Sequence, residues 1–186
     1  MDKIFLIGGK AGHGKSTFAD LLEEEIKQNT KLPVLRIAYG DCLKWVCQKY
    51  FDWSGNKDEA GRELLQRIGT DVVRAKDSDF WARFVAQFIN AVGNLYSAII
   101  IDDFRFPNEI EIYDAFPMLQ NKITTIKIER YENGAQYVNP NLTTLQKAHP
   151  SEIALDDFIF DYIIENHSIH ELKMSARELL DDLNIL

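Results

Sequence analysis

Eight consecutive residues near the amino terminus have the types and spacing needed to hold a chain of phosphates. Residues 9–16 read Gly-Lys-Ala-Gly-His-Gly-Lys-Ser and fit the pattern G-x-x-x-x-G-K-[ST] without a mismatch. Glycines let backbone N–H groups approach phosphate oxygens, where a Cβ atom would collide. The Lys15 ammonium can reach the β- and γ-phosphates, and the Ser16 hydroxyl is a suitable ligand for Mg²⁺. The pattern therefore predicts a phosphate-binding loop (P-loop) for a nucleoside triphosphate.

Two further features near this chemistry concern single side chains. His13 occupies a position that the pattern leaves free, so we expect its ring to face solvent. Asp102 and Asp103 follow the apolar run 98–101, which predicts a buried strand that delivers a carboxylate beside the phosphates. Both residues end this strand, and the pattern alone does not separate them.

The P-loop needs a strand before it and a helix after it. Residues 3–7 form a short apolar run, and Phe18, Leu22 and Ile26 recur at helical spacing after the loop. Strands alternate with helices along the rest of the chain, which predicts an α/β fold. We expect a three-layer P-loop NTPase sandwich, with helices on both faces of a five-stranded parallel sheet formed by residues 3–8, 34–38, 97–102, 123–129 and 160–164. Ligands should gather at the carboxyl ends of these strands.

Two other segments carry specific expectations. Residues 131–150 are polar and rich in Asn, Gly, Pro and Thr, and a connection of this length in a compact domain is usually functional or disordered. The helix expected after Ser78 carries an apolar stripe, which predicts that most of the stripe belongs to the core. Its members are Trp81, Val85, Phe88 and Val92, with Phe80, Phe84 and Ile89 beside them.

Composition limits the class of protein. The 186 residues predict one domain, and a formal net charge of −8 argues against nucleic acid as the main partner. Cys42 and Cys47 lie five apart without a second pair, so neither a disulfide framework nor a metal site is indicated. The sequence shows neither a signal-peptide pattern nor an apolar run of membrane-spanning length, and we expect a cytoplasmic protein without a membrane partner.

Several blocks resemble one family. Residues 61–74, with Arg-Glu-Leu-Leu-Gln, residues 103–109, which read Asp-Phe-Arg-Phe-Pro-Asn-Glu, and residues 149–152, His-Pro-Ser-Glu, are similar to the deoxynucleoside monophosphate kinases typical of tailed phages. Together with residues 160–166 and the P-loop, the resemblance spans nearly the whole chain. It implies one P-loop kinase domain over residues 1–186, with a monophosphate-binding insertion at about 39–93 and a mobile lid at about 131–150. The implied reaction transfers the γ-phosphate of ATP, with Mg²⁺, to a deoxynucleoside 5′-monophosphate.

The resemblance also implies roles for individual residues. Lys15, Asp103, Arg105 and Arg130 would act in the transfer, with Ser16 and Asp103 as the Mg²⁺ ligands. The ATP-binding set would be Gly9, Gly12, His13, Gly14, Lys15, Ser16, Thr17 and Asn166, with Asn166 beside the adenine. The acceptor-binding set would be Asp41, Arg62, Gln66, Arg74, Trp81 and Arg105. Plain alternatives stay open: Arg62 and Arg74 could be solvated surface charges, Trp81 could be core packing, and His149 is expected to order its loop rather than to act as a base.

Other functions use the same loop. One alternative is a kinase for another small acceptor, such as phosphomevalonate, dephospho-coenzyme A or a sugar acid. A second is a regulatory P-loop ATPase, although such proteins need an activating group from a partner, whereas this chain has its own arginines at acceptor and lid positions. The partners expected are nucleotide substrates, and a homodimer is left open.

Overall fold

A parallel sheet at the centre of the molecule carries the loops of the site. The computed structural model describes residues 3–56 and 58–185. The strands are β1 (Lys3–Gly8), β2 (Val34–Arg36), β3 (Ala98–Phe104), β4 (Ile123–Glu132), β5 (Ala135–Gln136) and β6 (Tyr162–Asn166). The parallel strands lie in the order β2-β3-β1-β4-β6, and β5 pairs antiparallel with the end of β4. The predicted parallel sheet is confirmed, with β5 as a short addition.

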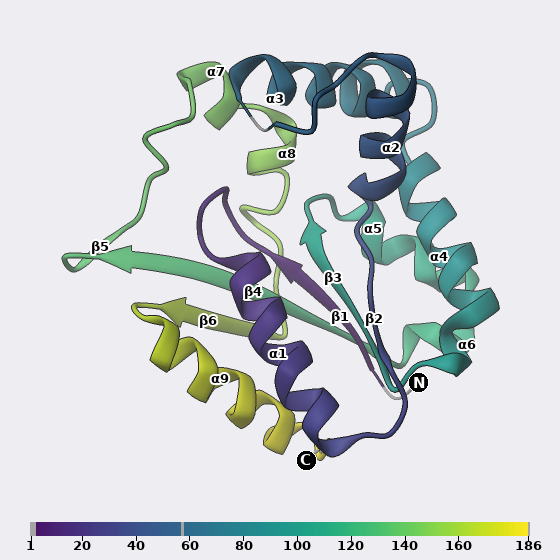
Figure 1. Ribbon diagram of the computed structural model, residues 1–186, viewed down its shortest axis with the longest axis vertical. Helices are drawn as coiled ribbons and strands as arrows, with labels where there is room; N and C mark the ends of the chain where they lie inside the picture. The colour runs from purple at the N-terminus through teal and green to yellow at the C-terminus, as the bar shows by residue number, and fades with distance from the viewer. Residues whose placement is uncertain (1–2, 57, 186) are drawn as a thin grey trace.

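Helices cover both faces of this sheet (Figure 1). The longer ones are α1 (Lys15–Asn29), α2 (Gly40–Tyr50), α3 (Glu59–Gln66), α4 (Phe80–Val92) and α9 (Ile169–Asp182). Short helical pieces are α5 (Asn108–Glu111), α6 (Pro117–Gln120), α7 (Thr144–Lys147) and α8 (Pro150–Ile153), with the 3₁₀ turns η2 (Gly93–Leu95) and η3 (Ile112–Ala115). A π-helix, η1 (Arg67–Arg74), continues directly from α3.

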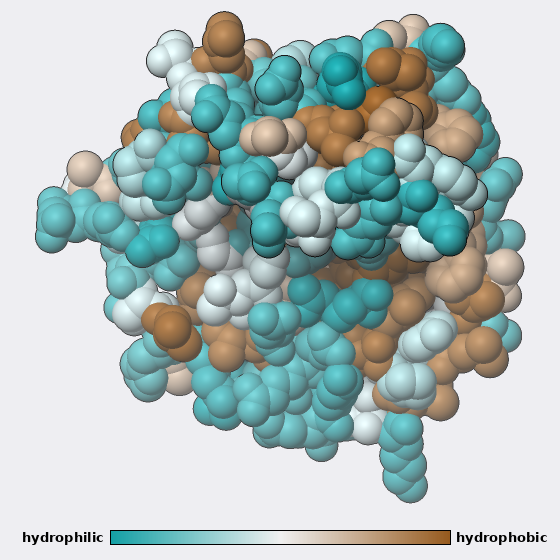
Figure 2. All heavy atoms as spheres, turned by 45° about the horizontal axis from the view of Figure 1, so that its top comes forward, coloured by the Kyte–Doolittle hydropathy of each residue, from teal (hydrophilic) through white to brown (hydrophobic). Residues whose placement is uncertain are grey.

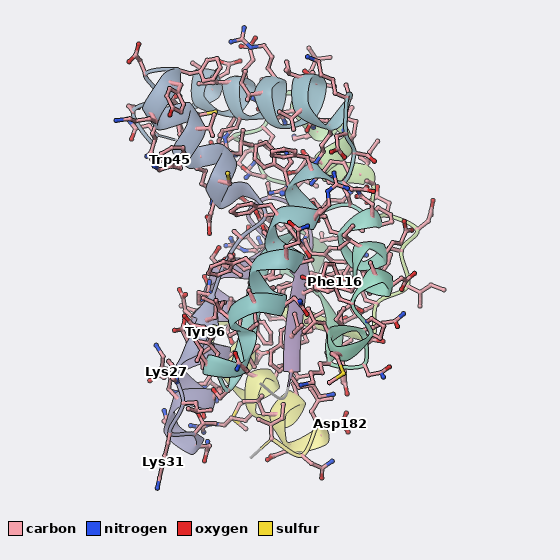
Figure 3. All side chains as sticks on the ribbon, turned by 90° about the vertical axis from the view of Figure 1, so that its right-hand side faces the viewer. Lys27, Lys31, Trp45, Tyr96, Phe116 and Asp182 are labelled. Carbon is pink, nitrogen blue, oxygen red and sulfur yellow. The ribbon has the colours of Figure 1, made fainter. Side chains whose placement is uncertain are left out.

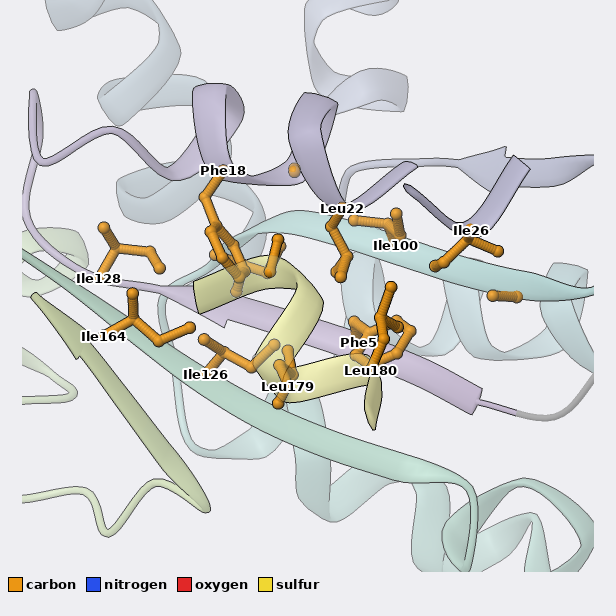
Figure 4. Close-up of a cluster of buried hydrophobic side chains, with 14 of the residues drawn as sticks. Phe5, Phe18, Leu22, Ile26, Ile100, Ile126, Ile128, Ile164, Leu179 and Leu180 are labelled. Carbon is orange, nitrogen blue, oxygen red and sulfur yellow. The ribbon is translucent and has the colours of Figure 1, made fainter. Parts of the chain in front are cut away.

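Alternation along the strands divides the core into two layers. Phe5 and Ile7 of β1 face α1 and α9, where they pack against Phe18 and Leu22 of α1 and Leu180 of α9 (Figure 4). Side chains at the intervening strand positions form the second layer, against α4 and the short helices: Ile4, Leu6, Ile99 and Ile101. Strands buried on both faces read as continuous apolar runs, which is why they were recognisable in the sequence.

The apolar stripe on α4 is only partly core. Trp81, Val85 and Ile89 are buried, whereas Phe80, Phe84 and Phe88 are exposed. The prediction that most of the stripe is core is therefore wrong for these three phenylalanines. Both sets follow the four-residue spacing of a helix, but one set lies about 100° around the axis from the other and faces away from the sheet.

The α2 helix and the segments that follow it form a helical region beyond the sheet. Trp45 lies at the outer side of α2, away from the strands, and its ring meets Tyr50 edge-on (Figure 3). Within residues 3–56 and 58–185, no helix has both the length and the apolar character that crossing a membrane requires.

Candidate active site

A cavity of about 840 Å³ lies at the carboxyl ends of the parallel strands. Its lining comes from four places: the P-loop, the helical region from Tyr39 to Trp81, the end of β3 with the segment after it, and parts of 130–152 together with the start of α9. On the face that Figure 2 brings forward, hydrophilic side chains cover most of the surface, and hydrophobic groups line a recess below the top helices. The strand order explains the position, because β1 lies between β3 and β4 and brings their loops beside the P-loop.

The P-loop backbone needs glycine at its two ends. Gly9 has φ 131°, and a Cβ atom there would lie 2.5 Å from the Ile128 carbonyl oxygen. Gly14 has φ 97° and immediately precedes α1, and a Cβ atom there would lie 2.5 Å from Nδ2 of Asn166. Both positions combine left-handed backbone with a close neighbour, so the pattern's two outer glycines have structural causes.

Lys15 is the buried cation of the loop. Its ammonium donates to the carbonyl oxygens of Gly9 at 2.8 Å and Lys10 at 2.9 Å, and the side chain is 8% exposed. Burial, with a smaller effect from the Arg105 charge, lowers the pKa of Lys15 to about 7. Near neutral pH the protonation of Lys15 therefore depends on nearby charges, and an anion beside it favours the charged ammonium.

The two aspartates that end β3 have different surroundings. Both carboxylate oxygens of Asp103 accept backbone N–H groups, from Tyr39 and Gly40, each at 2.8 Å, and burial raises the pKa of this carboxyl. Asp103 therefore anchors the start of α2. The Asp102 carboxylate pairs with Arg36 instead, and its Oδ2 accepts from the guanidinium at 3.1 Å.

This contrast bears on the Mg²⁺ assignment. Ser16 and Thr17 at the start of α1 and Asp102 all line the cavity, and hydroxyl and carboxylate oxygens are the hard ligands that Mg²⁺ prefers. The donor set therefore fits one Mg²⁺, held together with phosphate oxygens. Asp103, the ligand expected from sequence, also lines the cavity, but both of its carboxylate oxygens already accept backbone N–H groups. Within residues 3–56 and 58–185, no group of three or more His, Cys, Asp or Glu side chains is arranged to hold a metal ion.

Arg105 lies beside the P-loop and is held by α8. Its Nη1 donates to the Ser151 carbonyl oxygen at 2.9 Å and pairs with Glu152. The Arg105 backbone N–H donates to Glu109 at 2.7 Å, which fixes the chain at this point. The side chain lines the cavity.

The acceptor-side arginines are positioned differently from each other. Arg74 forms an ion pair with the buried Glu109, and its guanidinium lies 4.1 Å from the centre of the Phe106 ring. Burial raises the pKa of Glu109 to about 7, and Arg74 opposes that effect. Arg62 and Gln66 of α3 are half-buried and line the same cavity. Arg62 is therefore the more available of the two arginines, while Arg74 is largely committed to Glu109.

Trp81 and Asp41 also differ from each other, because only Trp81 lines the cavity. Trp81 lines the cavity, but it is 5% exposed and its indole N–H donates to the Gly69 carbonyl oxygen at 3.1 Å. It is a buried wall of the cavity, which combines the two interpretations made from sequence. Asp41 is exposed, accepts from the Ala38 N–H at 2.9 Å, and is not among the residues that line the cavity. Its neighbour Lys44 does line the cavity, and Asp41 accepts a hydrogen bond from the Lys44 ammonium.

The His13 side chain is buried, and the expectation that it faces solvent is wrong. Its Nε2 lies 3.0 Å from the Tyr137 carbonyl oxygen, an atom that only accepts, so Nε2 carries the hydrogen. Nδ1 lies 3.3 Å from both the Arg130 N–H and the Ile128 carbonyl oxygen. Burial lowers the pKa of His13. The ring thus ties the P-loop to the end of β4 and the first residues of the lid.

Arg130 and Asn166 complete the surroundings of the P-loop. Arg130 donates to the Gly12 carbonyl oxygen at 3.3 Å, and its guanidinium lies 4.5 Å from the centre of the Tyr137 ring. Asn166 donates to the His13 carbonyl oxygen at 2.9 Å. Both side chains line the cavity, and both hold the P-loop through carbonyl oxygens of the loop.

Sequence reasoning missed several residues of this site. Glu109 and Glu152 lie in the two blocks that resemble the kinase family, but acidic side chains were not expected around bound phosphates. Tyr39 and Lys44 also line the cavity. Lys44 could have been found from its place on the cavity-facing side of α2, one helical turn after Gly40.

Comparisons with known proteins add the fold class. The sequence matches no family model, and a search of curated proteins gives no match. Solved structures do match along nearly the whole chain. An unliganded sugar kinase from Janibacter sp. HTCC2649 has a TM-score of 0.53 at 12% identity, over 100% of this chain and 96% of that one. The APS kinase of Mycobacterium tuberculosis has a TM-score of 0.51 at 12% identity, over 98% and 96%. A complex of that enzyme with AMPPNP and APS also has a TM-score of 0.51, at 11% identity over 98% and 97%. The chain therefore has the P-loop kinase fold.

Proposed function

We propose that this chain transfers the γ-phosphate of ATP to a deoxynucleoside 5′-monophosphate. The observation that carries the proposal is the single cavity in which the P-loop and the cations Arg62, Arg105 and Arg130 meet. A motor or regulatory ATPase needs a site for one nucleotide and an activating group from a partner. Here one chain supplies a P-loop, further cations and space beyond them for a second substrate.

The acceptor is proposed from the part of the cavity that α3, α4 and the segment after β3 line. Arg62 and Arg105 can bind a phosphate through two parallel N–H···O bonds, a geometry that lysine lacks. Trp81, Leu65 and Leu43 provide apolar surface, and the Gln66 amide can hydrogen-bond the edge of a base. Cavities of about 300–1,000 Å³ suit ligands of nucleotide size. Together with the resemblance of residues 61–74 and 103–109, these features favour a nucleoside monophosphate over a smaller acid.

The transfer itself depends on positioned charge. The transition state of phosphoryl transfer is loose and spreads negative charge over the oxygens of the transferred group. Lys15, Arg105 and Arg130 surround the place that this group would occupy, and closure of the lid would keep water away from it. Mg²⁺, held by Ser16 and Asp102 with the phosphate oxygens, would neutralise charge on the β- and γ-phosphates.

An ADP-release assay over a panel of acceptors tests the proposal. We expect turnover with one or more of dGMP, dTMP, dCMP and dAMP and little without an acceptor. Lys15→Ala should lower that turnover by two to three powers of ten, or ~3–4 kcal/mol of transition-state stabilisation, while remaining folded. Turnover with phosphomevalonate or dephospho-coenzyme A alone would move the assignment to another small-molecule kinase. Equal ADP release with and without acceptor would indicate an ATPase instead.

A further inference from the structure

An acidic side chain occupies part of the P-loop. Oε2 of Glu152, in α8, accepts the backbone N–H of Ala11 at 3.0 Å, and Oε1 pairs with the Arg105 guanidinium. The Glu152 side chain is 9% exposed. Its backbone carbonyl oxygen also accepts from the Lys10 ammonium at 2.6 Å, so α8 is fastened to the loop at two points.

These partners are groups that a phosphate would use. The Ala11 N–H belongs to the nest of backbone donors that a P-loop offers to anions, and Arg105 is the cation proposed for the transferring phosphate. Burial would raise the pKa of Glu152, but the Arg105 charge and the Ala11 N–H outweigh it and hold this pKa below its usual value. At neutral pH the carboxylate is therefore charged, and a triphosphate arriving beside it would meet repulsion and occupied donors.

We propose that Glu152 is a built-in placeholder for phosphate, an autoinhibitory carboxylate that a nucleoside triphosphate must displace from Ala11 and Arg105. The inference rests on the proposed function only in that the P-loop binds a triphosphate. It does not depend on which acceptor is used.

The structure offers a place for the displaced carboxylate. A second cavity, of about 270 Å³, lies on the other side of Glu152 and is also lined by Lys10, Lys127 and Arg105. The ammonium groups of Lys10 and Lys127 can receive a carboxylate there, and both already pair with acids, namely Asp156 and Glu129. A rotation of the side chain into this space would free the Ala11 N–H.

Displacement of the Glu152 side chain would also affect the predicted lid. Glu152 lies two residues after position 150, where the predicted lid ends, and the Ser151 carbonyl oxygen is held by Arg105 as well. Releasing Arg105 from Glu152 would loosen one of the contacts that hold α8 against the P-loop. Triphosphate binding and lid rearrangement would then share one switch.

The test is the affinity for MgAMPPNP, measured by calorimetry without acceptor. Glu152→Gln keeps the shape but removes the charge, and we expect it to bind about tenfold more tightly than wild type, which corresponds to about 1.4 kcal/mol. Asp156→Asn is the matched control, because it removes one negative charge beside Lys10 without touching Ala11 or Arg105. It should stay within about twofold of wild type. Thermal unfolding checks that each variant is folded, and Glu152→Asp, too short to reach both partners, serves if the first variant is not.

The possible results distinguish the placeholder role of Glu152 from the proposed function. Equal or weaker binding by folded Glu152→Gln would overturn the placeholder and make Glu152 a positioning residue, with the proposed function intact. If Asp156→Asn bound MgAMPPNP equally more tightly, the loss of any negative charge near the loop would explain the result, and the placeholder would again be overturned. Absence of binding in wild type and in all variants would refute both the triphosphate site and the inference.

Discussion

Nucleotide binding should charge Lys15, and the uptake of a proton will report it. The pKa of Lys15 is lowered to about 7 by burial, against an ordinary value of 10.5. A phosphate beside the ammonium favours the charged form and should raise this pKa again. At pH 8, about nine-tenths of the free protein then carries a neutral Lys15, so binding should take up about 0.9 proton, against about 0.1 at pH 6.

The direction of the pH dependence follows from this linkage. A group whose pKa is higher in the complex contributes its full affinity below the lower pKa and loses it as pH rises toward the higher one. Affinity should therefore be constant below pH 7 and fall by about tenfold, or 1.36 kcal/mol, for each pH unit above it.

Calorimetry in buffers with different ionisation enthalpies measures the proton uptake directly. Lys15→Ala is the reference, because protonation of the nucleotide itself contributes equally to both proteins. Glu109→Gln is a second control, since the pKa of Glu109 is also about 7. At pH 8 we expect Lys15→Ala to lose the part of the proton uptake that is due to Lys15, and Glu109→Gln to keep it. An uptake at pH 8 that is the same for wild type and Lys15→Ala would refute the reasoning.

Three further outcomes are expected. Asp102→Asn should raise the Mg²⁺ concentration needed for half-maximal turnover. Asp103→Asn should mainly lower the free energy of unfolding, by about 1–3 kcal/mol, because it weakens the hydrogen bonds to the start of α2. A Mg²⁺ effect confined to Asp103→Asn would instead support Asp103 as the Mg²⁺ ligand. Arg105→Lys should raise the KM for the acceptor, because lysine lacks two parallel N–H donors, and an unaltered KM would remove this arginine from the acceptor site. Residues 131–150 should gain hydrogen-exchange protection on binding a bisubstrate analogue, and unchanged protection would count against a lid.

Most of the sheet could be predicted from sequence because its signals are local. Runs such as 98–101 are apolar at every position, and a strand buried on both faces needs nothing else. The P-loop is equally local, because its glycines are recognised from their spacing within one segment, and Gly9, Gly12 and Gly14 each have a left-handed φ angle. The edges were less certain: β4 extends to Glu132 and then turns into β5, because pairing with β6 and a hairpin turn at Asn133 and Gly134 continue it beyond its apolar part.

The site was harder to predict where side chains depend on distant partners. Asp102 and Asp103 look alike in sequence, and only the packing of α2 shows that the oxygens of Asp103 are occupied by backbone N–H groups. His13 is free to vary in the motif, yet its partners Ile128 and Tyr137 lie more than a hundred residues away. Patterns of spacing within one segment carry no information about such contacts.

The π-helix η1 determines which side chains can share the cavity with α3. Arg62 and Arg74 are twelve residues apart, and on a continuous α-helix, at about 100° per residue, they would point about 120° away from each other. Hydrogen bonds from i to i+5 widen each turn and reduce the rotation to roughly 80° per residue over Arg67–Arg74. The two arginines then return to nearly the same side, and both line the cavity. The angular position of Arg74 is thus set by how the backbone winds between the two residues. Removing one residue from Arg67–Arg74 and winding the segment as an ordinary α-helix would leave the two positions eleven residues apart, and eleven steps of about 100° also return to within about 20° of the same side, so Arg74 would keep its direction.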